Sequence, residues 1–122
     1  MEICRHIRLL AREWNVDLVL IEDTSSGMGV IQILQESSPF NIVGWTPRGT
    51  KESRMLQHLG RFEGGRYFLP KNEPWLADFE PELLGFPIAR HDDQVDALLL
   101  FLDWLSQRWR KPRYETGLPI AG

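Results

Sequence analysis

The sequence lacks several features that define whole classes of protein. It has one cysteine, Cys4, so no disulfide forms within the chain, and this usage suits a reducing cytoplasm. No apolar run approaches the ~20 residues that cross a bilayer, and the start lacks the long apolar core of a signal peptide. No GxxxxGK[ST] motif occurs, so the sequence contains no sign of the phosphate-binding loop of an ATPase motor domain. These absences favour a cytoplasmic protein with no membrane partner.

The chain also has little excess charge of either sign, with a net charge of −3. A strongly basic nucleic-acid coat protein is therefore not indicated. A nuclease remains compatible, because acids at its centre and bases around them cancel in the sum. One basic cluster contains Arg48, Lys51 and Arg54, although solvated surface charge is the plainer interpretation of any single member. The 122 residues, 43% of them hydrophobic, fit one ordinary globular domain.

The first half predicts a βαβ unit behind an N-terminal helix. Apolar residues recur at helical spacing from Ile3 to Trp14. The nearly unbroken apolar run Val16–Ile21 is typical of a strand covered on both faces. A short helix around residues 30–34 and a second strand in "NIVGWTP" follow. Strand, helix and strand in this order predict a right-handed crossover between parallel strands.

The second half predicts mainly helices. "GTKESRMLQHLGRFEGG" is expected to form one, capped by Thr50 and ended by the paired glycines. "RYFLP" suggests a short edge strand or an extended segment. Another helix is expected from Pro74, with a break or kink at Pro81. The last helix is expected from Asp93 to Arg108, which makes residues 1–109 a domain and 110–122 a flexible tail. The predicted fold class is α/β, with a short, mostly parallel sheet flanked by helices.

Acidic residues stand at two places in this pattern. Glu22 and Asp23 end the first strand, where ligands bind in open α/β sheets. Asp92, Asp93 and Asp96 stand at the start of the last, very apolar helix. If this helix packs near the strand end, the carboxylates converge, and a hard divalent cation such as Mg²⁺ would relieve their repulsion. Two such ions about 4 Å apart can hydrolyse a phosphodiester.

Simpler interpretations account for part of this pattern. Asp92 suits a helix N-cap, and acids in a first turn gain roughly 0.3–1 kcal/mol from the helix dipole. Capping explains Asp92 and Asp93, but it explains Asp96 poorly, because that residue enters the apolar part of the helix. Glu22 and Asp23 alone suit an ordinary strand end, and His91 alone is more often a structural or substrate-contacting residue than a metal ligand.

A series of segments in order carries a more specific signal. "LVLIEDTSSGMGVIQILQE", "TPRGTKESRM", "GGRYFLP", "PWLADFEPELLGFP" and "HDDQVDALL" cover most of the chain from Leu18 to Leu100. The series resembles the carboxyl-terminal nuclease domain of the large terminase subunit of tailed phages and prophages. The resemblance implies a ribonuclease-H-like fold and a hydrolase: a Mg²⁺- or Mn²⁺-dependent endodeoxyribonuclease that cuts concatemeric viral DNA during packaging. It also implies a bacterial host cytoplasm and, as partners, double-stranded DNA, the terminase ATPase domain, the small subunit and the portal.

The same resemblance implies roles for single residues. Glu22 matches the acid that ends the fourth strand of the fold, with Asp23 as its alternative. Asp93 matches the acid at the start of the final helix, and Asp96 matches a second acid in resolvase-like relatives. Asp92 and His91 belong to that motif, Asp92 as a further metal ligand. The DNA-contacting residues would be Arg48, Lys51, Arg54 and His91. For Lys51 and Arg54 the alternative is a helix face that pairs with Glu52.

One departure from the family pattern bears on activity. The ribonuclease-H-like fold begins with three antiparallel strands, the first of which carries a central catalytic Asp, and here nothing precedes the first helix. The chain thus corresponds to a truncated form, expected to bind Mg²⁺ or Mn²⁺ weakly and to cut DNA poorly, so whether it is an active enzyme stays open. The Val16–Ile21 strand would present an open apolar edge, which favours a homo-oligomer.

Three other functions fit the same residues. The domain could be a non-catalytic packaging module that docks on DNA or the portal. It could be a nuclease of the Holliday-junction-resolvase type, which would prefer four-way junctions. The plainest alternative is a structural α/β protein with a capped helix.

Overall fold

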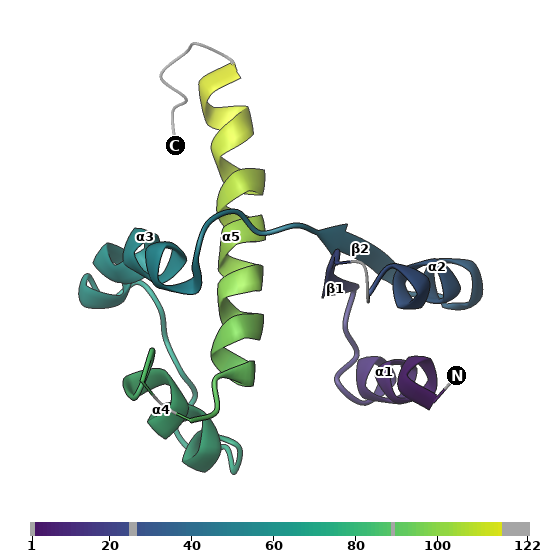
Figure 1. Ribbon diagram of the computed structural model, residues 1–122, viewed down its shortest axis with the longest axis horizontal. Helices are drawn as coiled ribbons and strands as arrows, with labels where there is room; N and C mark the ends of the chain where they lie inside the picture. Colours follow the sequence, from purple (N-terminus) through teal and green to yellow (C-terminus); the bar gives the residue numbers. More distant parts are fainter. Residues whose placement is uncertain (1, 25–26, 89, 116–122) are drawn as a thin grey trace. The chain divides into compact units, whose positions relative to one another are not determined.

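The computed structural model describes residues 2–24, 27–88 and 90–115, and its elements fall into two units, Met1–Pro47 and Arg48–Gly122 (Figure 1). The first unit contains α1 (Glu2–Glu13), β1 (Leu18–Glu22), α2 (Met28–Ser37) and β2 (Asn41–Trp45). The second contains α3 (Lys51–Glu63), α4 (Leu76–Leu84) and α5 (Asp93–Glu115). Among the described residues, none of the helices combines the length and apolarity needed to cross a membrane.

The first unit is a βαβ unit with α1 packed on it. β1 and β2 are parallel, as the sequence pattern predicts, and they pair from Leu18 opposite Asn41 to Glu22 opposite Trp45. Alternate strand residues point to opposite faces of the sheet. Ile42 therefore turns toward the helices together with two residues of β1. The core consists of Cys4, Ile31, Leu34 and Ile42, with Val19 and Ile21 packed against it.

The turn that leaves β1 needs a glycine. A Cβ atom on Gly27 would lie 2.8 Å from the backbone oxygen of Glu22, closer than real Cβ contacts allow. The backbone N–H of Gly27 also donates to the backbone oxygen of Thr24 at 3.0 Å. This close approach lets α2 begin directly behind the strand end, so Glu22 and Asp23 stand at the point where the chain reverses.

The second unit packs α3 and α4 against α5. α3 begins as predicted, because the Thr50 hydroxyl accepts a hydrogen bond from the N–H of Ser53 at 3.1 Å. This satisfies one of the N–H groups that a helix start leaves without a partner. The buried apolar residues of this unit come from α4 and α5: Leu76, Phe79, Val95, Leu99, Leu100 and Leu102.

Two expectations about the second unit are wrong in detail, and a third, which allowed two conformations, is decided. Of the edge strand and the extended segment expected for "RYFLP", the strand does not form; the segment has no regular secondary structure, and its Tyr67 ring packs edge-on against Phe62 of α3, with centroids 4.7 Å apart. α4 begins at Leu76 rather than Pro74 and continues through Pro81 without a break, since burial of its apolar face outweighs one lost backbone hydrogen bond. α5 continues to Glu115 rather than ending at Arg108. Of the predicted flexible tail, residues 116–122 lie outside the described part.

Candidate metal centre

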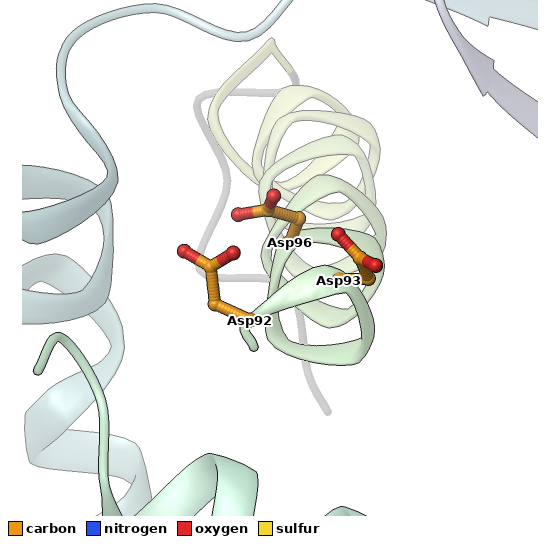
Figure 2. Close-up of side chains that lie close together, drawn as sticks. All are labelled: Asp92, Asp93 and Asp96. Carbon is orange, nitrogen blue, oxygen red and sulfur yellow. The ribbon is translucent and has the colours of Figure 1, made fainter. Parts of the chain in front are cut away.

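Three carboxylates gather at the first turn of α5. One oxygen from each of Asp92, Asp93 and Asp96 lies within 4.8 Å of an oxygen from the other two. Figure 2 shows Asp92 and Asp96 projecting to one side of the turn and Asp93 to the other. Asp93 is exposed, and Asp92 and Asp96 are half-buried. Unit charges this close repel by roughly 1 kcal/mol per pair even in bulk water, so a nearby cation stabilises the cluster.

Lys51, the first residue of α3, supplies one positive charge to this cluster. Its Nζ lies 3.1 Å from Oδ2 of Asp92 and 3.0 Å from Oδ2 of Asp96. The hydrogen bonds to Asp96 and then to Asp92 raise the pKa of Lys51 above its usual value of 10.5. Lys51 thus pairs with the acidic cluster and not with its helix neighbour Glu52, which was the sequence-based alternative.

Glu82 of α4 holds the start of α5, and the sequence analysis did not identify it. Its Oε2 accepts the backbone N–H of Val95 at 2.7 Å, and its Oε1 accepts the side-chain N–H of Gln94 at 3.1 Å. An N-cap side chain would ordinarily accept such a first-turn N–H. Because Glu82 does this from another helix, the carboxylate of Asp92 is available for the cluster.

A buried ionic triad lies further along the contact between α3 and α5. Arg54 Nε donates to Oδ2 of Asp103 at 2.6 Å, and His58 Nε2 lies 2.9 Å from Oδ1 of the same carboxylate. Arg54 is 6% exposed and His58 only 2%. We therefore assign Arg54 to the helix contact, which leaves Lys51 as the more accessible cation of the predicted basic pair. Asp103, like Asp96, is signalled in sequence by a carboxylate inside an apolar helical run.

The polar contacts between α3 and α5 advance in the same order along both helices. Lys51 contacts Asp92 and Asp96, the triad follows about two turns later at Asp103, and Arg61 donates to the hydroxyl of Ser106 at 2.8 Å. Breaking a buried ion pair costs several kcal/mol, so the triad selects one register of α3 on α5. That register places Lys51 at the acidic cluster.

The remaining predicted site residues are exposed. Arg48 and His91 lie at the surface of the second unit, beside the residues that form the cluster in sequence. In the first unit, Glu22 is exposed at the end of β1. Asp23 follows β1, and its backbone N–H donates to the backbone oxygen of Trp45 at 2.8 Å. The Asp23 carboxylate lies beside Gly44, where an added Cβ would be 3.4 Å from its Oδ2. The meeting of Glu22 with Asp93, which belong to different units, stays a prediction.

The donor set of the cluster fits a hard divalent cation. Carboxylate oxygens are the ligands that Mg²⁺ and Mn²⁺ prefer. Oδ1 of Asp96 is buried and has no hydrogen-bond partner among the described residues, although buried polar atoms are usually paired. The arrangement therefore offers an oxygen-rich, partly shielded position with one oxygen not yet engaged.

Comparison with known proteins identifies the family. The family model of the terminase RNaseH-like domain matches residues 2–104, a range that includes both strands of the first unit and the acidic cluster of the second. Comparisons with curated proteins and with solved structures gave no match. The match spans most of the chain and agrees with the α/β architecture of parallel strands and flanking helices. The chain belongs to the family of terminase RNaseH-like domains.

Proposed function

We propose that this chain is a divalent-metal-dependent endonuclease domain of a phage or prophage terminase large subunit, acting on double-stranded DNA during packaging. Membership in the family supports a nuclease role in DNA packaging. The observation that carries the metal dependence is the cluster of Asp92, Asp93 and Asp96 at the start of α5, with an unengaged oxygen on Asp96. Asp93 and Asp96 would be the principal ligands, and Asp92 would assist.

Glu22 completes the proposed ligand set as a fourth carboxylate. It ends β1, the position that ligands favour in open α/β sheets, and it is exposed there. Divalent cations of the two-metal type would activate water and stabilise the leaving oxygen of the phosphodiester. The acids of the chain bind and orient these ions, and exposed Arg48 and His91, together with half-buried Lys51, hold the DNA backbone through largely sequence-independent contacts. The ATPase domain, the small subunit and the portal are the proposed protein partners.

Substitution of Asp93 tests this function. Asp93→Ala should abolish Mn²⁺-dependent nicking of plasmid DNA, even if the wild-type chain cuts slowly, and should lower Mn²⁺ affinity measured by calorimetry. Asp17→Ala removes an exposed acid just before β1 and is the matched control, expected to behave like the wild type. Glu22→Gln should also weaken Mn²⁺ binding, whereas an unchanged affinity would remove Glu22 from the ligand set.

Other outcomes would point to the alternatives. DNA binding that survives Asp93→Ala, together with no cutting by any variant, would indicate a non-catalytic packaging module. Preferential cutting of four-way junctions over linear duplex would indicate a resolvase-type nuclease. Nicking at the wild-type rate by Asp93→Ala would refute the proposed site.

A further inference from the structure

We infer that Lys51 is an intramolecular counter-ion of the acidic cluster, exchanged for the divalent cation when that cation binds and then available to a DNA phosphate. This inference rests on the proposed metal-dependent function and assigns to one residue a coupling between metal binding and DNA binding. It concerns the ammonium group of Lys51 and the carboxylates of Asp92 and Asp96, whose positions within one unit are described above.

The balance of charge at the acidic cluster favours the exchange. Three carboxylates share the first turn of α5, and among the described residues the cation paired with them is Lys51. Three carboxylates and one ammonium leave the cluster with a net charge of about −2. A divalent cation would neutralise this net charge, but it would place two positive charges next to the ammonium of Lys51. Repulsion between the ion and the ammonium therefore favours release of Lys51.

Lys51 also binds carboxylate oxygens that a metal ion could use. Lys51 uses Oδ2 of Asp92 and Oδ2 of Asp96, whereas Oδ1 of Asp96 has no hydrogen-bond partner within the described part of the chain. A cation that bridges the two residues through these Oδ2 atoms, at the ~2.1 Å distance of Mg²⁺–oxygen bonds, competes with the ammonium for their lone pairs. The single free oxygen on Asp96 is a starting point for such a bridge, but it does not complete one.

The position of Lys51 at the start of α3 also favours release of its side chain from the carboxylates. Lys51 is the first residue of α3, its side chain is 43% exposed, and its ammonium is a flexible point charge on four methylenes. Arg54, three residues later, is instead buried and fixed by Asp103. The backbone at Lys51 is therefore held by the triad while its ammonium can move. Arg48, three residues earlier in the sequence, is also exposed, so a released ammonium would add a second positive charge for a phosphate in this segment.

Exchange of Lys51 would couple metal binding and DNA binding reciprocally. If a phosphate draws Lys51 away from the carboxylates, DNA raises metal affinity, and by linkage the metal raises DNA affinity by the same factor. Removal of the ammonium eliminates the competition. The free chain should then bind the metal more tightly, and DNA should have less left to add.

Mn²⁺ binding by the whole chain tests the exchange. Affinity is measured by calorimetry with and without a short DNA duplex, for wild type, Lys51→Met and Lys51→Gln, with far-UV circular dichroism to check folding. Lys71→Met removes an exposed lysine in the loop before α4 and is the matched control. We expect both Lys51 variants to bind Mn²⁺ roughly fivefold or more tightly than wild type without DNA, within the usual range of coupling effects. DNA should tighten Mn²⁺ binding to wild type and Lys71→Met more than to the Lys51 variants.

The outcomes separate this inference from the proposed function. Equal or weaker Mn²⁺ binding by the folded Lys51 variants would overturn the exchange, whatever the nuclease activity. Absence of Mn²⁺ binding by every variant would overturn both proposals. Tighter binding by the Lys51 variants without DNA cutting by any variant would support the exchange and refute the nuclease assignment alone.

Discussion

Replacement of Asp103 by alanine should strongly destabilise the second unit. Asp103 is the only carboxylate in the triad, and its side chain is 12% exposed. Without it, the guanidinium of Arg54 and the imidazole of His58 stay buried with no acceptor between them. Breaking a buried ion pair by removing one partner typically costs about 3–5 kcal/mol. This is a large fraction of the roughly 5–15 kcal/mol by which a whole domain is stable.

Urea and thermal unfolding followed by circular dichroism measure this loss. For a chain of this size 1 kcal/mol corresponds to roughly 4 °C, so Asp103→Ala should lower Tm by about 12–20 °C. Glu80→Ala removes an exposed acid of α4 and is the matched control, expected within about 0.5 kcal/mol of wild type. The double variant Arg54→Met with Asp103→Leu should recover part of the loss, because the charge of Arg54 is no longer left buried without a partner, whereas His58 still lacks the acceptor that Asp103 provides.

If the free energy of unfolding of Asp103→Ala lies within about 1 kcal/mol of the wild-type value, the buried Arg54 does not depend on this carboxylate and the prediction is refuted. It also fails if the double variant is less stable than Asp103→Ala. In that case the two helices would be held by the specific geometry of the ion pair and not by the avoidance of an unpaired buried charge.

The remaining predictions concern other contacts of the site and the sheet. Glu82→Ala should lower the free energy of unfolding by about 1–2 kcal/mol, as for loss of a helix cap, and Glu82→Gln by less; equal losses would show that its hydrogen bonds to α5 contribute nothing. Because the pKa of Lys51 is raised in the fold, its contribution to stability should be complete below pH 10.5 and fall as the pH rises through the higher folded value. The difference in unfolding free energy between wild type and Lys51→Met should thus be constant near neutral pH and shrink in strong alkali. A difference that grows in strong alkali would contradict a raised pKa of Lys51. β1 pairs only with β2 among the described residues, so we expect self-association through its other edge. Light scattering that shows a monomer at high concentration would contradict this.

The sequence alone predicted the elements of the first unit because their signals are local. A continuous apolar run, a glycine turn and a second apolar run specify strand, helix and strand, and the parallel orientation of β1 and β2 follows from the crossover. Thr50 and the glycines after residue 63 likewise mark both ends of α3. The run of Asp92, Asp93 and Asp96 also showed where carboxylates gather, because residues three and four apart share a helix face.

Only the tertiary structure decided what neutralises and supports those carboxylates. Lys51 is 41 residues from Asp92 in sequence, and Arg54 is 49 residues from Asp103, so no local pattern joins them. Glu82 replaces the expected cap of α5 from a neighbouring helix. A single helix face leaves the choice of partner open, because any acid can be solvated, capped or paired. Packing of α3 and α4 on α5 makes that choice, by burying some charges and leaving others accessible.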